Sequence, residues 1–496
     1  MRTARRILIT ASLAALVAGC AVKPAPLTEA ELADAARDRL ERVDRDQEAV
    51  VGDIGIYDAM ARALKYNLDH RVEMMQIALA QNQLRSAGAD MLPRLAANAG
   101  YASRSNTAAS YSRTLVSGIT SAEPSTSSQR ANLAGDLTFS WHVLDFGLSY
   151  VRAKQAADKA LVQEELKRKV VNRIVEDVRT AYWRAVSADR LLNGFRALET
   201  RVVKAQANTR ALRRAGRTSP LAALTFEREL IDIKRNIQRF DRELADAKHQ
   251  LAALMNVRPG RPFKLVLPKR TLIELDISMT GDEMVELALR NRPEFRDLLY
   301  KERINRKEAT AALLEMLPGA SVYAGLSFDT NAFLLNANWA SWGLKAGWNL
   351  MQVLQYPARK AVVDAHTQVI DAQSLAMTMA IMTQVHVARS RYAHMRKSAA
   401  TSAEYYEVQR RIRDQIRASV SASAESEQTL IREEMNTLVA AVEYDMAYAD
   451  LQNAFATVFA SIGIDPHGPD IDAGLPVEEL AARLREAWRQ RGDVGG

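Results

Sequence analysis

The chain contains a very long stretch, 358–462, that has neither glycine nor proline. A second stretch, 148–215, has no proline and a single glycine. Because glycine and proline are the main helix-breaking residues, both stretches predict helices of unusual length. At ~1.5 Å per residue, one helix over 148–215 would be roughly 100 Å long. Helices of this length pack side by side in coiled coils or helical arrays, and not in a compact globule.

The same order of sequence features occurs twice along the chain, which indicates a duplication. The offset between matched positions is 225 at first, then 207 and finally 203. The first copy therefore has about 18 extra residues (225 minus 207), in a loop at 106–130 that is rich in Ser, Thr and Ala. Such length variation is typical of a surface loop. The matched positions are Leu92-Pro93 with Leu317-Pro318, Trp141 with Trp348, and Gly260 with Gly463.

Each copy reads as helix, strand, loop, strand, long helix, turn and long helix. We place the first copy at 51–265 and the second at 266–465, followed by a tail at 466–496. The turns between the two long helices are expected at about 216–220 and at about 418–421. We expect the tail and the segment before residue 51 to lie outside any tunnel that the helices form.

Four segments alternate between polar and apolar residues, at about 95–104, 132–143, 320–329 and 340–350. Alternation over roughly ten residues is typical of transmembrane barrel strands, although half-buried strands of a soluble sheet are the alternative. Four strands cannot close a membrane barrel, and an open sheet edge is not tolerated in lipid, so several copies would have to share one barrel. Tryptophans near the strand ends suit an interfacial girdle. These are Trp141, Trp339, Trp342 and Trp348.

The N-terminal residues resemble a lipoprotein signal peptide, 1–19, with Cys20 as the lipidation site, palmitate being an expected acyl group. Three arginines precede a short apolar core, which is too short to span a bilayer. Cys20 is the single cysteine of the chain, and Ala21 after it favours transfer to an outer membrane. Residues 20–50 would then be a lipid-anchored segment. An ordinary signal peptide with an incidental cysteine is the alternative.

The overall charge does not favour nucleic acid as a partner. The formal net charge is +8, and removal of 1–19 with its three arginines leaves about +5. A mildly basic exported chain is not typical of nucleic-acid binding. The sequence also lacks the common zinc-protease, serine-hydrolase and phosphate-loop motifs. We therefore expect no enzymatic activity, no catalytic residue, no cofactor and no metal site.

Several segments resemble the TolC-like outer-membrane efflux and secretion factors. Residues 56–72 and 287–301 resemble the openings of that family's two repeats, and 137–147 resemble its strand with a Trp and an Asp-x-Gly turn. Residues 215–257 resemble its turn and returning helix, and the likeness covers about 50–465. The second copy departs from the pattern, with Met351-Gln352 at the turn.

The resemblance implies a mainly α fold with membrane β-strands. Three chains with four strands each would give a 12-stranded trimeric barrel, continuous with a long periplasmic α-helical barrel. It also implies a passive outer-membrane channel in a Gram-negative bacterium, working with a periplasmic adaptor (membrane fusion) protein and an inner-membrane transporter in efflux or type I secretion. A structural coiled-coil lipoprotein that tethers the envelope is the competing interpretation.

The resemblance further implies two groups of site residues. The tips would contact the adaptor, although the glycine expected at Ala418 is missing. Polar residues beside the second tip would hold the channel shut. The adaptor-contact residues are Gly216, Thr218, Ser219, Leu221, Ser419 and Val420, and the gate candidates are Asp414, Arg417, Glu425 and Glu427.

A group of arginines precedes each turn. Cations suit a helix C-terminus, but the macrodipole accounts for only one or two at each end, and a solvated helix face is the other simple explanation. We interpret them as a basic collar that docks an acidic adaptor tip or favours anionic cargo. Its members are Arg210, Arg213, Arg214, Arg217, Arg410, Arg411, Arg413 and Arg417.

Overall fold

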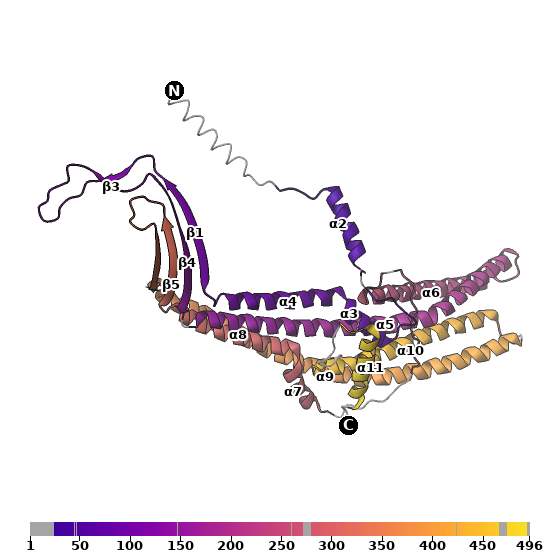
Figure 1. The fold of residues 1–496 in the computed structure, drawn as a ribbon. Coiled ribbons are helices and arrows are strands. Elements are labelled where there is room, and N and C mark those ends of the chain that lie inside the picture. The colour runs from indigo at the N-terminus through magenta and orange to yellow at the C-terminus, as the bar shows by residue number, and fades with distance from the viewer. Residues whose placement is uncertain are drawn as a thin grey trace.

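A computed structural model describes residues 24–493 except 44, 46, 146, 259, 271–278, 423 and 466–473. Cys20 and the expected signal peptide lie outside these described residues. Long helices lie side by side and are continued at one end by a curved sheet (Figure 1). No helix in the described ranges is long and apolar enough to cross a membrane.

The order of elements repeats the predicted pattern twice. The first copy consists of α3 (Ile56–Tyr66), α4 (Leu68–Ala89), β1 (Arg94–Ser103), β2 (Ala108–Ser110), β3 (Ser125–Ser128), β4 (Ala131–Leu144), α5 (Leu148–Arg214) and α6 (Pro220–Leu254). The second consists of α7 (Gly281–Asn291), α8 (Pro293–Glu315), β5 (Gly319–Asp329), β6 (Asn338–Gly347), α9 (Leu350–Ser421) and α10 (Glu427–Ser461). Two further helices flank the copies, α2 (Glu29–Arg42) and α11 (Val477–Asp493).

The four predicted strands form one antiparallel sheet in the order β1-β4-β5-β6. Each begins and ends within three residues of the predicted bounds. The expected surface loop at 106–130 contains the β2–β3 ribbon, which extends beyond the sheet (Figure 1). The outer strands β1 and β6 each have one edge without a partner strand in the described part of the chain.

The strand register assigns every side chain to one of two faces, because residues directly opposite one another in an antiparallel pair point to the same side. Leu137 pairs with Leu326 and Phe139 with Ala324, so the predicted apolar residues share a face. Trp339 is an exception to the predicted girdle, because it pairs with Ser327 on the polar face. The other three tryptophans lie on the apolar side by register or alternation, namely Trp141, Trp342 and Trp348.

The helices continue the strands in the same order. α4 leads into β1, α5 follows β4, α8 leads into β5 and α9 follows β6, and neighbouring helices contact one another along the row α4-α5-α8-α9. The row therefore also has two outer members, α4 and α9. Sheet and helices form one continuous wall (Figure 1).

Equivalent tryptophans fix the junction between helix and strand in both copies. Trp141 Nε1 donates a hydrogen bond to the Met91 carbonyl oxygen at 3.2 Å. Trp348 Nε1 does the same to the Met316 carbonyl oxygen at 2.9 Å. Each bond satisfies an acceptor just beyond a helix C-terminus, where carbonyl groups lack intrahelical partners. The matched tryptophans thus have matched roles.

The long helices after the sheet start with different caps. In the first copy Asp145 accepts hydrogen bonds from the backbone N–H groups of Gly147 at 2.9 Å and Ser149 at 3.0 Å. In the second copy Asn349 accepts from the N–H of Met351 at 3.2 Å. The departure from the Asp-x-Gly pattern is therefore compensated, because an asparagine side chain caps a helix as well as an aspartate does.

The helices α5 and α6 form the first helical hairpin, and α9 and α10 form the second. Equivalent positions in the two hairpins are 207 residues apart, the same offset that relates Trp141 to Trp348. α6 and α10 each have 35 residues, and their N-caps are Ser219 and Ser426. After the helices, Asn256 and Gly463 both adopt positive φ, 53° and 76°. Matching Gly260 with Gly463 was therefore wrong, since Asn256 occupies the left-handed C-terminal position in the first copy. Asparagine tolerates this conformation better than most other residues.

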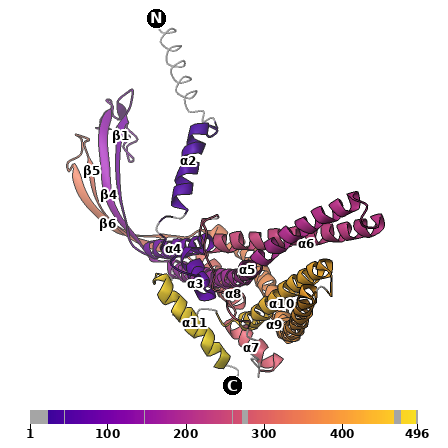
Figure 2. The same ribbon diagram turned by 90° about the vertical axis from the view of Figure 1, so that its right-hand side faces the viewer.

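Residues outside the two copies pack around the middle of the molecule. α11 contacts α3 and contributes Leu480, Leu484 and Trp488 to the core cluster there. The Trp488 ring lies 4.2 Å from the Arg179 guanidinium carbon, a cation–π arrangement. Figure 2 shows α11 crossing this region, away from both the sheet and the hairpin ends. α2, by contrast, has no buried residue.

Candidate functional site

The two hairpin ends carry most of the predicted contact residues. In the first turn, Gly216 has a φ of 69°, which glycine adopts without strain. Thr218 and Ser219 complete this turn, and Leu221 on the first turn of α6 is 75 % exposed. The two hairpins point away from one another at their ends in both ribbon views (Figures 1 and 2). Each end is therefore a separate surface.

The second turn differs from its predicted position at 418–421. α9 continues to Ser421 and α10 begins at Glu427, so the turn comes later in the sequence than predicted. Ser419 and Val420 consequently lie in the last turn of the helix. Alanine at 418 is a strong helix former, so nothing there ends α9. Applying the offset of 207 to Gly216 leads to position 423, which lies outside the described residues.

Six of the eight arginines of the predicted basic collar form ion pairs within the chain. Arg210 and Arg213 pair with Glu227, Arg410 and Arg411 with Glu407, Arg413 with Asp414, and Arg417 with Glu434. The Arg210 hydrogen bond lowers the pKa of the Glu227 carboxyl. For Arg214 and Arg217, the described residues show no ion pair. Within the described chain, only the first tip therefore presents unpaired cations of the collar.

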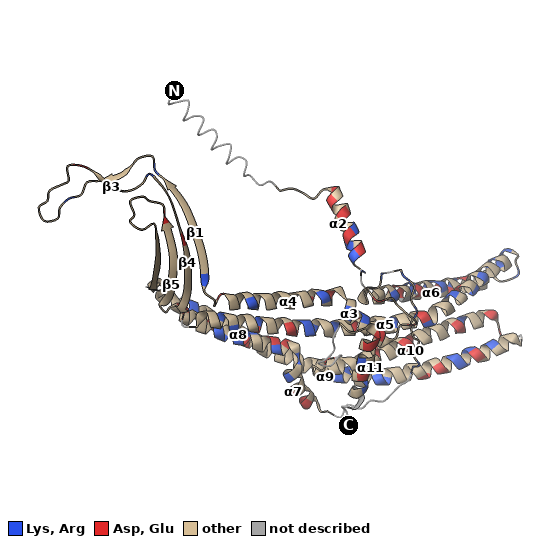
Figure 3. Cartoon of the chain, viewed as in Figure 1, with Lys and Arg blue, Asp and Glu red and all other residues tan. Residues whose placement is uncertain are grey.

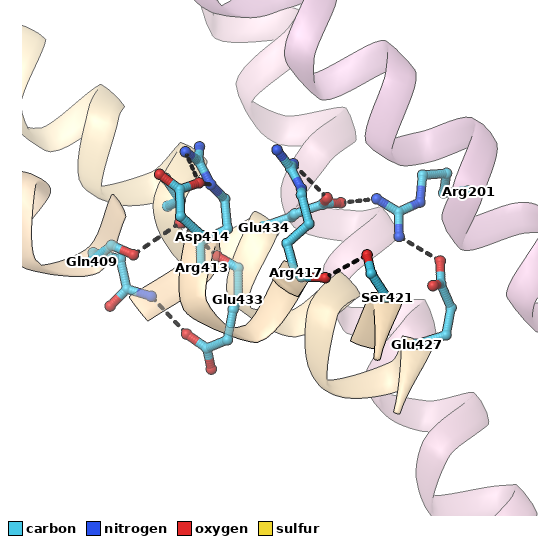
Figure 4. A network of polar contacts seen from close by, with 10 residues as sticks. Arg201, Gln409, Arg413, Asp414, Arg417, Ser421, Glu427, Glu433 and Glu434 are labelled. Atoms are coloured by element: carbon cyan, nitrogen blue, oxygen red, sulfur yellow. Dashed lines mark hydrogen bonds and ion pairs between the residues drawn. The ribbon is translucent and has the colours of Figure 1, made fainter. Parts of the chain in front are cut away.

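A polar network connects the two hairpins close to their ends (Figure 4). Arg201 on α5 pairs with both Glu427 and Glu434 on α10. Arg417 on α9 reaches the second oxygen of Glu434 at 3.0 Å. The Glu434 side chain is only 12 % exposed, so it accepts hydrogen bonds from two guanidinium groups at a site that is largely shielded from solvent. Such charge-assisted hydrogen bonds are stronger than neutral ones.

A second ion pair crosses between the hairpins. Arg432 on α10 binds Glu229 on α6 through two hydrogen bonds, one of them 2.8 Å long. The Arg432 hydrogen bond lowers the pKa of Glu229. For Arg201, burial disfavours the charge, but the hydrogen bonds to Glu434 and Glu427 outweigh it and raise the guanidinium pKa. These groups therefore stay ionised together at neutral pH.

Apolar packing supports this polar link. Leu198 and Val202 of α5 lie in one core cluster with Ile431 and Met435 of α10. Leu230 of α6 belongs to the same cluster and is fully buried. The hairpins are thus joined by apolar packing as well as by ion pairs. Movement of one hairpin against the other must break these ion pairs.

The predicted gate residues occupy this region but differ in their contacts. Arg417 and Glu427 belong to the network, whereas Asp414 binds the adjacent Arg413 at 2.6 Å. Glu425 is exposed in the second turn, and the described residues show no ion pair for it. Sequence reasoning missed the residues that span the hairpins, namely Arg201, Glu229, Arg432 and Glu434.

Among the described residues, no group of three or more His, Cys, Asp or Glu side chains is placed to hold a metal ion. The charged residues instead follow the helix surfaces along their length (Figure 3). What the arrangement can do is hold two helical hairpins together or release them.

Comparisons with known proteins agree with this geometry. The family described as "Outer membrane efflux protein" matches residues 59–257. The CmeC outer membrane channel of Campylobacter jejuni is 12 % identical with a TM-score of 0.64, over 94 % of this chain and 97 % of that one. CusC is 17 % identical with a TM-score of 0.63, over 85 % and 96 %. The open state of the Neisseria gonorrhoeae MtrE outer membrane channel is 15 % identical with a TM-score of 0.60, over 85 % and 95 %. No protein of curated function matches the sequence.

Proposed function

We propose that this chain is the outer-membrane channel of a tripartite export system, because residues 59–257 match the outer membrane efflux protein family and the fold is that of solved outer-membrane channels. Three copies would conduct substrates passively from a periplasmic adaptor and an inner-membrane transporter to the outside, in efflux or type I secretion. Lipidation at Cys20 would add a membrane anchor. The matching family and the similar solved structures are described as efflux proteins and channels, which agrees with a role other than catalysis.

One observation carries this proposal: the wall of strands and helices has two open edges. β1 and α4 form one edge, and β6 and α9 form the other. A sheet with open edges is not tolerated in lipid, because its backbone groups would lack hydrogen-bond partners. Pairing β6 of one copy with β1 of the next removes both edges. Three copies of four strands give an even-numbered barrel of twelve, within the range of membrane barrels.

The tether interpretation explains less of the structure. A periplasmic coiled coil needs neither a sheet with exposed tryptophans on one face nor two matched helix-to-strand junctions. Trp342 is 85 % exposed and Leu344 is 72 % exposed, on the same side of β6. Such a face requires a cover, and lipid supplies one. We therefore favour the channel.

Planar-bilayer recording of the purified protein, together with its mass in detergent, tests the proposed function. We expect a particle of three chains that forms small, mostly closed channels. The trimer should survive mild detergent and dissociate on heating, as barrels do. A monomer that never conducts would contradict the channel and support the tether.

The unpaired arginines at the first tip allow the adaptor contact to be tested. We expect Arg214→Glu with Arg217→Glu to abolish export while leaving protein abundance and trimer formation unchanged, because like charges repel an acidic partner. The matched control is Arg410→Glu with Arg411→Glu, since those side chains already pair with Glu407. Export assays in cells and adaptor binding in vitro measure the effect. Full export by the Arg214 and Arg217 variant would disprove the docking role.

A further inference from the structure

The charged residues and the histidine of the sheet follow a pattern that the proposed channel function does not require. Among the residues of β1, β4, β5 and β6 only five are acidic, basic or histidine. The register and the alternation along each strand place all five on the same face, opposite to the face with Leu137, Leu326 and Trp342. Figure 3 shows how few charged residues the strands carry in comparison with the helices. The five are Arg94, Asp136, His142, Asp329 and Lys345.

These residues are also sorted along the strands by sign. Arg94 is the first residue of β1, and Lys345 lies two residues before the end of β6, so both are beside the helices. Asp329 is the last residue of β5, at the end far from the helices. Asp136 lies between them, opposite Asn98 in the register. Within the strands, the helix end is therefore basic and the part farther from the helices is acidic.

Hydrogen bonds hold the acidic side chains on this face. Asp136 accepts from Asn98 Nδ2 at 3.1 Å and from Thr138 Oγ1 at 2.7 Å. Asp329 accepts from Asn132 Nδ2 at 3.1 Å. All of these donors are neutral, so they orient the carboxylates without cancelling the charge. The basic side chains of Arg94 and Lys345 are exposed.

From this sorting we propose that the lumen of the barrel is a bipolar ion filter, with a cationic ring at its periplasmic end and an anionic ring toward the outside. The inference rests on the proposed function, which places the polar face inside a trimeric barrel. Three copies would supply six cations from Arg94 and Lys345, and six anions from Asp136 and Asp329. Small cations then meet a barrier at one ring and small anions at the other. Solutes that carry charges of both signs are held back less.

The two rings are far enough apart to act separately. Arg94 pairs with Ser140, which is four residues from Asp136 along β4, a distance of about 13 Å at ~3.3 Å per residue. The Debye length is ~10 Å at 0.1 M salt and ~3 Å at 1 M. At about 0.1 M the Debye length is shorter than the distance between the rings, so each ring dominates its own part of the lumen, whereas at 1 M neither ring has much reach. Arg104 directly follows β1 and Arg130 directly precedes β4, so further cations lie outside the strands, about 13 Å beyond the register position of Asp329 at ~3.3 Å per residue.

Reversal potentials across a salt gradient test the filter. Asp136→Asn with Asp329→Asn should lower the cation-to-anion permeability ratio by roughly two-fold or more, because rings of fixed charge concentrate counter-ions. Arg94→Gln with Lys345→Gln should raise that ratio by a similar factor. Both changes should disappear at 1 M salt. The matched control is Asp34→Asn with Glu41→Gln, which removes two carboxylates from the exposed α2 outside the sheet.

The possible outcomes separate the filter from the channel itself. Opposite shifts at about 0.1 M salt, absent in the control, support the filter. Conducting channels whose permeability ratio is the same in all variants overturn it and leave the proposed channel intact. Absence of conductance in the unchanged protein counts against the proposed function and the filter together. Should a double variant fail to form trimers, Asp136→Asn and Lys345→Gln are measured singly, and unchanged ratios in both overturn the filter.

Discussion

Replacement of Glu434 by glutamine is expected to open the proposed channel. Glu434 accepts hydrogen bonds from Arg201 of one hairpin and Arg417 of the other, so it is the shared acceptor of the network in Figure 4. A hydrogen bond to a charged group contributes about 1.5–3 kcal/mol. Loss of one such contribution shifts the ratio of open to closed channels by about 10- to 100-fold, since about 1.4 kcal/mol corresponds to a factor of ten. Single-channel recording measures this ratio directly.

Two controls make the result specific to the network. Glu443→Gln changes the same residue type on α10 at an exposed position for which the described residues show no ion pair. Arg201→Gln removes the partner from α5 and should open the channel to a similar extent. Combining it with Glu434→Gln should add little, because both changes break the same contact. An open probability that stays at the level of the unchanged protein in both single variants would show that the hairpins are held by apolar packing alone.

The helices and strands were predictable because their signals are local. Absence of glycine and proline over 358–462 predicts the helices, and polar alternation predicts the strands to within three residues. The sides of the sheet follow from the same alternation, with Trp339 as the exception. The turn near 418 was misplaced although Trp141 and Trp348 already give the offset of 207. The turn was placed by the glycine expected at position 418, which gave the wrong alignment of the two copies. The helix caps Ser219 and Ser426 are instead separated by the offset of 207.

The network between the hairpins could not be predicted in the same way. Arg201 and Glu434 are 233 residues apart, and each lies on a helix surface with many other charges. Their contact depends on how α5 packs against α10, which no local pattern specifies. The collar was overestimated for the same reason, since a sequence lists arginines but not their partners. Glu227, 17 residues after Arg210, pairs with two of them across the first turn.

The open helix edges lead to the second prediction, a covalent trimer. On α4, Ile77 is buried toward the row, and Met75, two residues earlier, is turned by about 200° to the opposite side. On α9, Val363 is buried, and Ala365 is turned away by the same angle. A large side chain thus faces outward on one edge, and a small one on the other. Such pairs interdigitate when helices pack.

Met75 and Ala365 also lie at the same distance from the junction between helices and strands. Met75 precedes Met91, whose carbonyl oxygen binds a junction tryptophan, by a sequence separation of 91 minus 75, or 16. Ala365 follows Asn349, the cap of α9 at the other edge, by 365 minus 349, which is again 16. At ~1.5 Å per residue both positions are about 24 Å from the junction. When the edges of two copies meet in a closed barrel, these residues become neighbours.

We therefore expect Met75→Cys with Ala365→Cys to form disulfides between copies under mild oxidation. A disulfide needs Cα atoms about 4.4–6.8 Å apart, so only facing positions react. Every copy carries both cysteines, and the product on a non-reducing gel should be a covalent trimer. The control is Met75→Cys with Asp364→Cys, one residue away and turned by about 100° on α9. Met75→Cys is also combined with a cysteine at Ala361 or Ala372. If these variants and the Ala365 variant all remain monomeric after oxidation, the two edges do not meet, and the twelve-stranded barrel loses its basis.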